Sequence, residues 1–275
     1  MPRRRFGAAP IESPPMIKIF GERNTSTNAL KKLIETNSAS KVLPSVVREN
    51  DPDFMRRTWA WRKASKYGPA RLKPYFEGQF QRRIDAVFDG VPPTHAWKHT
   101  ATYFDDISVF DGVPVVFNVR HPASWLLSLY KNPYENLAAR PASFGAFLDY
   151  EWKTAGRENL DQKSLKPAAL YAEKLASYQV LIQQLKAAGL PYQVVKFEDI
   201  ILDQAGVFER LRPLLQDPAA EVQVIQKSTK TNAKDLSYYQ DYYGNEAWRA
   251  EISEHLATLR LQVPAEVCAA FDYEI

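Results

Sequence analysis

The sequence predicts an α/β protein, a single domain in which helices flank a central parallel β-sheet. Short apolar runs typical of buried strands alternate with amphipathic helical patterns. The intervals between the runs leave room for the crossover helices that parallel strands require. The chain has 275 residues, of which 45% are hydrophobic and 25% charged, enough to build one sizeable core. We therefore expect a three-layer sandwich of helices, sheet and helices.

The first half of the chain holds two predicted strand–helix units. Residues 16–20 form a short apolar strand that ends at Gly21, and apolar residues follow at helical spacing from 29 to 34. Residues 113–119 form a second buried strand. A helix follows it from about residue 125, with a proline well placed in its first turn.

A further unit is expected in the second half. Apolar residues step by four and three from 171 to 185, which predicts an amphipathic helix that stops at Gly189. A strand at 192–197 and a helical pattern over 204–215 follow. Ligands of parallel sheets bind beyond the carboxyl ends of the strands. Polar residues directly after the first two strands therefore mark the place to look for function.

The domain is expected to span residues 16–275, preceded by a disordered basic arm at 1–15. The arm lacks the apolar core of a signal peptide, and no stretch reaches the roughly 20 apolar residues of a transmembrane helix. The only cysteine is Cys268, which excludes an internal disulfide and a cysteine-based zinc site, so we expect a cytoplasmic protein. No metal-ligand spacing is present, and no metal is expected. The net charge of +4 is compatible with an anionic ligand.

The segment 21–28, Gly-Glu-Arg-Asn-Thr-Ser-Thr-Asn, has the length and position of a phosphate-binding P-loop. It departs from the Walker A pattern, because Ser26, Thr27 and Asn28 replace the second glycine, the lysine and the magnesium-binding hydroxyl residue. Nucleotide phosphate binding without ATP hydrolysis remains open, and so does a plain polar helix cap. The fold is thus expected to be P-loop nucleotide-binding-like.

A second polar segment follows the strand at 113–119. Arg120 can form a bidentate contact with a phosphate, and Ser128 can add a hydroxyl from the next helix. Here the chain resembles the PAPS-dependent sulfotransferases, which use 3′-phosphoadenosine 5′-phosphosulfate (PAPS) and pair an arginine with a serine at this spacing. Residues 194–203 also resemble the family's strand ending in an aromatic-Glu-Asp triplet. The three matches span most of residues 16–215 in the family's order.

The resemblance implies transfer of a sulfuryl group from PAPS to a hydroxyl acceptor, a carbohydrate or a glycolipid, with adenosine 3′,5′-bisphosphate as product and no metal. It implies that the first loop binds the 5′-phosphosulfate through Arg23, Asn24, Thr25, Ser26, Thr27 and Asn28. Arg120 and Ser128 would bind the 3′-phosphate, helped by Lys227 or Lys230 from a late basic loop. Phe197 would also belong to the donor site.

For the chemical step, the resemblance implies a histidine base, which we expect to be His99, and we expect the adjacent Lys98 to be a catalytic residue as well. Arg23 is the only basic side chain of the first loop and is expected on the bridging oxygen, although Asn24 holds the family's basic position. Ser26 restricts the backbone if its position requires a positive φ. His121 is the rival base, but beside Arg120 it would lie at the donor's far end. His255 is expected at the surface.

Several features are left open by the sequence. Residues 56–75 hold seven Lys/Arg, no acidic residue and four aromatic residues. This segment fits an acceptor cleft for an acidic glycan or a solvated basic helix, and less well a nucleic-acid surface, which we do not expect. Residues 238–243, rich in tyrosine, either cover the active site or pack a C-terminal helix. The competing functions are a P-loop kinase or NTPase and a non-catalytic nucleotide-binding protein of the same fold.

Overall fold

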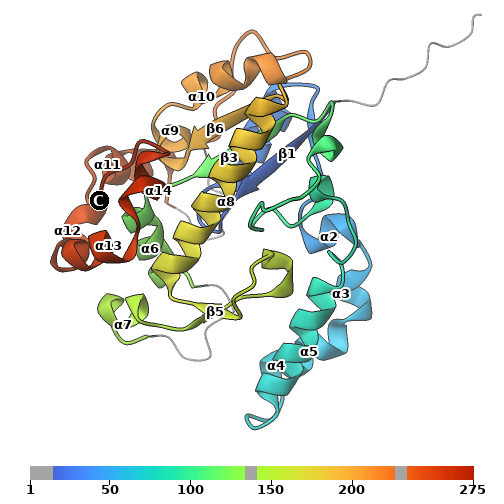
Figure 1. The fold of residues 1–275 in the computed structure, drawn as a ribbon, viewed down its shortest axis with the longest axis vertical. Helices are drawn as coiled ribbons and strands as arrows, with labels where there is room; N and C mark the ends of the chain where they lie inside the picture. The colour runs from blue at the N-terminus through green and yellow to red at the C-terminus, as the bar shows by residue number, and fades with distance from the viewer. Residues whose placement is uncertain (1–14, 134–140, 227–233) are drawn as a thin grey trace, which may run out of the picture.

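The computed structural model describes residues 15–133, 141–226 and 234–275 (Figure 1). Its centre is a sheet of four parallel strands in the order β2-β1-β3-β6. The strands are β1 (Met16–Gly21), β2 (Lys41–Val42), β3 (Val115–Val119) and β6 (Tyr192–Lys196). The predicted α/β class is confirmed, and the three expected strands lie within two residues of their predicted bounds. The two-residue edge strand β2 was not expected.

Helices cover both faces of the sheet, because successive side chains of a strand point to opposite faces. One face buries Ile17, Ile19, Val116 and Val195 against α1 (Thr27–Asn37) and α10 (Gln204–Leu211). The opposite face buries Phe20, Val115, Phe117 and Val119 against α6 (Pro122–Lys131) and α8 (Pro167–Ala187). Figure 1 shows α8 lying across the front of the sheet. Burying each such side chain contributes about 1.5–3 kcal/mol, so this alternation fixes the register.

The strands β1 and β3 end side by side, since Gly21 pairs with Asn118. A Cβ atom at Gly21 would lie 2.7 Å from the carbonyl oxygen of Asn118 and 2.9 Å from Cγ2 of Thr27, so only glycine fits there. The chain continues from β1 to β2 on one side and later to β3 on the other. This reversal of strand order opens a crevice at the carboxyl ends, the usual ligand site of such sheets.

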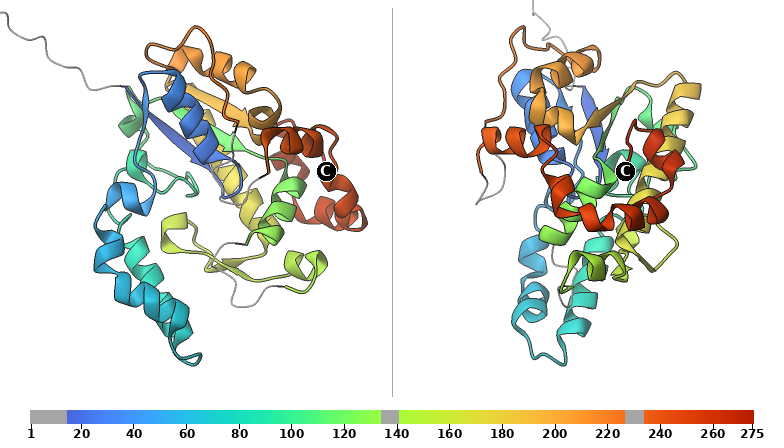
Figure 2. Two further views of the ribbon diagram at one scale, coloured as in Figure 1. Left: turned by 180° about the vertical axis from the view of Figure 1, so that it is seen from behind. Right: turned by 90° about the vertical axis from the view of Figure 1, so that its left-hand side faces the viewer.

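The C-terminal part of the chain adds short helices beside this crevice. They are α9 (Phe197–Leu202), α11 (Leu236–Gly244), α12 (Trp248–Glu251), α13 (Leu256–Gln262) and α14 (Ala265–Ala269). Figure 2 shows the last four gathered on one side of the molecule, near α6. The triplet Phe197-Glu198-Asp199, expected to end a strand, instead begins α9. The predicted helix over 204–215 ends at Leu211 and continues as a 3₁₀ turn, because Pro213 lacks the N–H that a longer helix needs.

Two further pieces lie outside the sandwich. One is a small antiparallel pair, β4 (Trp152–Lys153) and β5 (Ser164–Leu165), preceded by α7 (Phe144–Leu148). The other follows α2 (Val47–Asn50) and projects from the body: residues 54–85, with α3 (Phe54–Arg57), α4 (Trp59–Tyr67) and α5 (Lys73–Asp85), here called the helical hairpin (Figures 1 and 2). Among the described residues, no helix combines the length and the apolar character needed to cross a bilayer.

Candidate functional site

A cavity of about 310 Å³ opens at the carboxyl ends of β1 and β3. Three segments that are distant in sequence meet there: the loop after β1, the residues Lys98 and His99, and Arg120 with the first turns of α6. Helices α9 and α11 complete the wall. The cavity therefore lies where strand order predicts a ligand. Its lining among the described residues contains the cations Lys98, Arg120 and Lys131 and no carboxylate.

The loop after β1 has an unusual backbone. Asn24 and Ser26 adopt φ angles of 63° and 66°, in the left-handed region that costs most residues about 1–2 kcal/mol. Thr25 stabilises the turn by donating its hydroxyl hydrogen to the carbonyl oxygen of Glu22 at 2.6 Å. Ser26, which stands where the P-loop pattern has a glycine, therefore does adopt the positive φ that glycine accommodates more easily. Strained turns of this kind persist where a loop must present its backbone to a ligand.

The loop leads into the N-terminus of α1, which can receive an anion. No side chain caps this end of the helix, and its first turn holds no acidic residue. The first backbone N–H groups of a helix lack intrahelical partners, and the helix dipole favours negative charge beside them. Ser26, Thr27 and Asn28 line the cavity at this point. The geometry suits a phosphate or sulfate group.

Arg120 also lines the cavity and is only 3% exposed. Its guanidinium donates to the Oγ of Ser124 at 2.8 and 3.0 Å, to the carbonyl oxygen of Asn24 at 2.8 Å and to the hydroxyl of Tyr243 at 2.8 Å. It stacks 4.0 Å from the ring centroid of Phe197. These contacts hold the cation at the cavity wall, and they join the loop after β1 to α6, α9 and α11.

Ser128 lines the cavity one helical turn beyond Ser124. It is half-buried, and no residue in the described part of the chain forms a hydrogen bond with its hydroxyl. The serine that accepts hydrogen bonds from Arg120 is Ser124, four positions along, which was not predicted from the sequence. The spacing of one helical turn could have identified it. Both predicted 3′-phosphate residues, Arg120 and Ser128, nevertheless face the same cavity.

His99 is held in one tautomer at the edge of the cavity. Its Nδ1 lies 2.5 Å from the carbonyl oxygen of Gly21, which can only accept, so Nδ1 carries the hydrogen. Nε2 is then the nitrogen free to take a proton. Burial, followed by the charges of Lys98 and Arg23, holds the pKa of His99 well below its usual value. The imidazole is therefore neutral at pH 7.

Lys98 lies beside His99 and reaches the start of α1. Its ammonium donates to Oδ1 of Asn28 at 2.6 Å, and both residues line the cavity. Burial lowers the pKa of Lys98 to about 8, although nearby Glu49 acts in the opposite direction. An anion in the cavity would favour the charged ammonium and raise this pKa.

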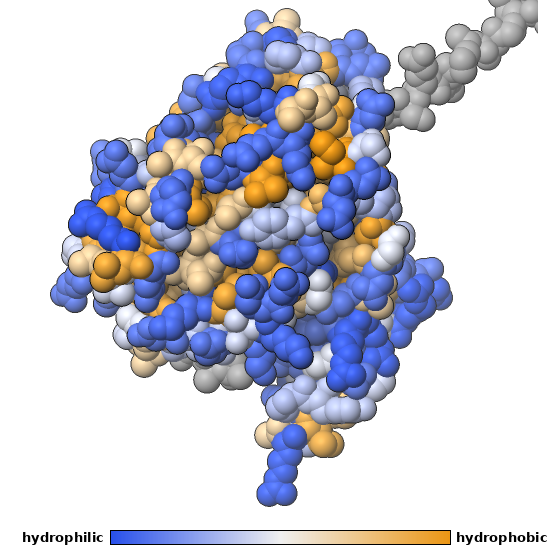
Figure 3. Space-filling view, viewed as in Figure 1, coloured by the Kyte–Doolittle hydropathy of each residue, from blue (hydrophilic) through white to orange (hydrophobic). Residues whose placement is uncertain are grey.

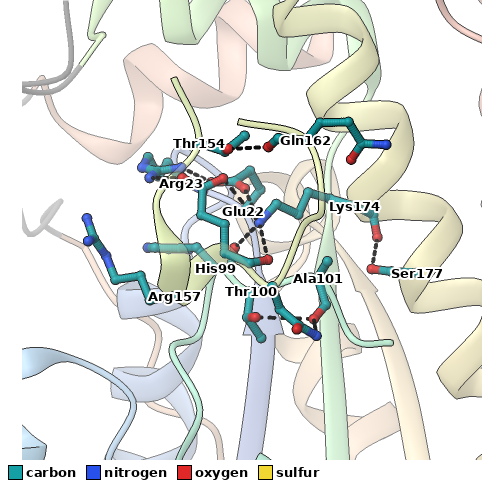
Figure 4. A network of polar contacts seen from close by, with 12 residues as sticks. Glu22, Arg23, His99, Thr100, Ala101, Thr154, Arg157, Gln162, Lys174 and Ser177 are labelled. Atoms are coloured by element: carbon teal, nitrogen blue, oxygen red, sulfur yellow. Dashed lines mark hydrogen bonds and ion pairs between the residues drawn. The ribbon is translucent and has the colours of Figure 1, made fainter. Parts of the chain in front are cut away.

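Arg23 does not line the cavity and belongs instead to a cluster of four buried charges, of which Figure 4 labels Glu22, Arg23 and Lys174. Its guanidinium lies 2.8 Å from Glu22 and 2.9 Å from Glu158. The ammonium of Lys174, from α8, lies 3.4 Å from Glu158 and donates to the carbonyl oxygen of His99 at 2.6 Å. We call Glu22, Arg23, Glu158 and Lys174 the buried charge cluster.

The buried charge cluster is electrically balanced, with two carboxylates and two cations. Burial alone would lower the pKa of Arg23, but Glu158 and Glu22 outweigh it and raise that pKa. Desolvation would raise the pKa of Glu158, yet Lys174 and Arg23 hold it below its usual value. Both shifts favour the charged forms of Arg23 and Glu158. The four groups join the loop after β1 to α8, to residues 156–158 and to the backbone of His99, which makes the cluster a support for the cavity.

The remaining predicted residues divide into three groups. Asn24 and Phe197 line the cavity, whereas Thr25 is buried in the loop and does not. Lys227 and Lys230 lie outside the described residues; Gln226, just before them, lines the cavity. His121 faces a second cavity, with Nε2 2.7 Å from the carbonyl oxygen of Glu274. His255 packs against Phe144, 5.4 Å between ring centroids, and is half-buried.

The tyrosines of α11 are part of the site. The side chains from this helix that line the cavity include Tyr238, Tyr239, Tyr242 and Tyr243. The ring of Tyr243 lies 4.8 Å from that of Phe197, edge to face. These tyrosines line the cavity, and Tyr242 and Tyr243 also pack against the main core, so the structure supports both interpretations left open by the sequence.

No known family model matches the chain, and no curated protein matches it. Within the described ranges, no group of three or more His, Cys, Asp or Glu residues has the geometry to hold a metal ion.

Proposed function

We propose that this protein is a sulfotransferase that binds PAPS in the cavity and transfers its sulfuryl group to a hydroxyl acceptor, a carbohydrate or a glycolipid. One observation carries the proposal. The described lining of the cavity contains no carboxylate and combines the N-terminus of α1 with Lys98 and Arg120, which form no ion pair among the described residues, and with Lys131, which pairs with Glu251. This arrangement suits a donor with two phosphates and a sulfate. The resemblance of the two phosphate segments to the sulfotransferases supports the same conclusion.

The donor's parts correspond to different walls of the cavity. The loop Asn24–Asn28 and the N-terminus of α1 would bind the 5′-phosphosulfate. Arg120 and Ser128, eight positions apart in sequence and both in the cavity wall, would bind the 3′-phosphate, with Arg120 already braced by Ser124 and Tyr243. The adenine would lie against the apolar and aromatic lining, which includes Leu127, Phe197, Ile200 and Ile201.

For the chemical step, we assign His99 as the general base. Its Nε2 accepts the acceptor's hydroxyl proton while the acceptor oxygen forms a bond to sulfur and the bond from sulfur to the 5′-phosphate oxygen breaks. The carbonyl oxygen of Gly21 fixes the tautomer, and Lys174 fixes the backbone of His99. Gly21 and Lys174 hold His99 in place and take no part in the bond changes themselves.

The cation that stabilises the leaving phosphate is assigned to Lys98. The sequence had suggested Arg23, but that guanidinium is engaged by two carboxylates and does not line the cavity. Lys98 lies at the start of α1, next to His99, and lines the cavity. A positive charge there acts most strongly as negative charge develops on the leaving oxygen. Arg23 contributes indirectly, by holding the loop.

Two measurements test the proposed function. In a thermal-shift panel, adenosine 3′,5′-bisphosphate should raise the melting temperature, whereas ATP with magnesium should raise it less. Incubation with radiolabelled PAPS and libraries of glycans, glycolipids and phenols should then transfer label to a hydroxyl compound. A larger shift with ATP and magnesium would favour a P-loop kinase. A shift with the bisphosphate but no transfer to any acceptor would favour a non-catalytic nucleotide-binding protein.

The single cysteine supports a reducing compartment for this activity, and we propose the cytoplasm. Cys268 is free and buried, so the fold neither has nor needs a disulfide within the chain.

A further inference from the structure

The helical hairpin, residues 54–85, carries the strongest charge in the molecule. It holds nine Lys/Arg and two Asp/Glu, a net charge of +7, whereas the whole chain carries +4. Eight of the nine cations are exposed. Among the described residues, no carboxylate forms an ion pair with Arg62, Lys63, Lys66, Arg71 or Lys73. These cations are therefore available to an external partner.

The tip of the hairpin is also rich in exposed apolar surface. Tyr67 is 71% exposed, Leu72 48% and Tyr75 56%, and every residue from 69 to 75 is exposed. Figure 3 shows this projection mostly in blue, with small orange and tan areas near its lower end. A convex tip that combines aliphatic and aromatic side chains with flanking cations has the chemistry of a membrane-interface segment.

We propose that the helical hairpin docks the protein on an anionic lipid bilayer, with Tyr67, Leu72 and Tyr75 entering the interface and the surrounding cations contacting lipid phosphates. Long Lys and Arg side chains can keep their charges at the headgroups while their stems lie along apolar surface. Attraction to anionic lipid supplies the specificity, and the small apolar tip makes the association reversible.

Two observations favour a bilayer over the other anionic surfaces. Nucleic acids and glycans stack on open aromatic faces, but here one of the protein's own cations already lies against each of three rings, although Trp59 and Tyr67 stay 61% and 71% exposed: Lys63 lies 4.9 Å from the centroid of Trp59, Arg83 3.9 Å from Trp61 and Lys66 5.3 Å from Tyr67. The hairpin is moreover separate from the cavity, since none of residues 54–85 lines it. It is thus a docking element, not a wall of the acceptor site.

The hairpin is fixed to the body, so docking would orient the whole domain. Asp85 at the end of α5 pairs with Arg157 at 2.6 Å and accepts from the backbone N–H of Gly156 at 3.1 Å. Arg157 in turn stacks 4.7 Å from the centroid of Trp97, two residues before His99. The inference does not depend on the reaction proposed above.

Vesicle co-sedimentation of the full chain tests this inference. The protein should pellet with phosphatidylcholine vesicles that contain phosphatidylserine, should remain in the supernatant with phosphatidylcholine alone, and should be released by salt. The triple variant Lys66→Glu/Arg71→Glu/Lys73→Glu should bind about a hundredfold more weakly, at about fivefold for each cation removed. Tyr67→Ser/Leu72→Ser should weaken binding severalfold with the charge unchanged.

Charge-matched control variants separate the hairpin's contribution to vesicle binding from that of the net charge. Lys153→Glu/Lys163→Glu/Lys186→Glu changes the charge of exposed sites elsewhere by the same amount. Arg3→Glu/Arg4→Glu/Arg5→Glu changes the net charge equally near the start of the chain. Both should retain most of the binding. Equal loss in either control, equal binding to uncharged vesicles, or binding of a single-stranded oligonucleotide through the hairpin without vesicle binding would overturn the proposal.

Discussion

The buried charge cluster and the helical hairpin use the same kinds of side chain in opposite ways. Arg23 and Lys174 are enclosed, with side chains at most 6% exposed, and each contacts two carboxylates. The hairpin cations lie in water, most of them without a carboxylate partner among the described residues. A buried charge is tolerated only when it is paired and hydrogen-bonded, whereas an exposed charge needs no partner. Whether an Arg or Lys side chain stabilises the fold or is available to bind an external partner therefore depends on its environment and not on its residue type.

The cavity lies between these two extremes. Arg120 is buried but braced by neutral groups, among them Ser124 and Tyr243, so its charge is not cancelled by a carboxylate within the described residues. Lys98 is likewise buried beside a neutral amide. Such positively charged, desolvated groups are poised for an anion. The molecule thus has three kinds of cation: buried and paired with carboxylates, buried beside neutral groups in the cavity, and exposed on the hairpin. Substitutions can distinguish them.

The largest effect is expected from breaking the buried charge cluster. Glu158→Ala would leave Arg23 and Lys174 with one fewer carboxylate in a dry site, which should lower the free energy of unfolding by about 3–5 kcal/mol. Chemical denaturation measures this directly. Asp53→Ala, which breaks the exposed pair with Arg56 at the start of the hairpin, is the matched control and should leave the midpoint nearly unchanged. Similar midpoints for the two variants would contradict the distinction.

The next effect concerns the base. His99→Ala should lower kcat at least about a hundredfold, while affinity for adenosine 3′,5′-bisphosphate changes little, because the imidazole meets the acceptor's proton. A nitrophenol acceptor, which is already acidic, should recover part of the lost rate. His255→Ala is the control and should keep full turnover, since that ring packs against Phe144 away from the cavity. Full activity in His99→Ala would assign the base elsewhere.

A smaller effect should appear in the pH dependence of nucleotide binding. The pKa of Lys98 is lowered to about 8 by burial, so its ammonium is charged below that pH and neutral above it. Affinity for adenosine 3′,5′-bisphosphate should hence fall about tenfold from pH 7 to pH 9, the limit for losing one required proton with this pKa. Lys98→Met should bind weakly at both pH values and remove most of the slope. A parent protein whose affinity is flat over this range would exclude Lys98 from the donor site.

Local patterns predicted the parts of the molecule that local sequence determines. The strand ending at Gly21, the loop after it, and Arg120 at the end of the next strand were all placed correctly, because apolar periodicity and a proline or glycine define such units. Parallel strands bring their carboxyl ends together, so the meeting of the two segments also followed from the pattern. Phe197, which only the resemblance to the sulfotransferases suggested, also lines the cavity, although it begins α9 instead of ending β6.

The direction of side chains depended on partners far along the chain. Arg23 turns inward because Glu158, 135 positions away, offers it a buried carboxylate. Tyr243 reaches Arg120 across 123 positions. No local pattern reveals such pairs, and the acceptor side of the site is subject to the same limit. Ser124 differs, since its spacing of one helical turn from Arg120 was visible in the sequence.

The most direct test of the proposed donor site is calorimetric titration of adenosine 3′,5′-bisphosphate into the parent protein, Arg120→Ala and Arg212→Ala. Arg120→Ala should lose about 1.5–3 kcal/mol of binding free energy, the scale of a hydrogen bond to a charged group. Arg212 pairs with Glu209 at the surface, and its removal should leave binding unchanged. Ser128→Ala should show a smaller loss than Arg120→Ala. Binding by Arg120→Ala as tight as that of the parent would contradict the assignment of the cavity as the donor site.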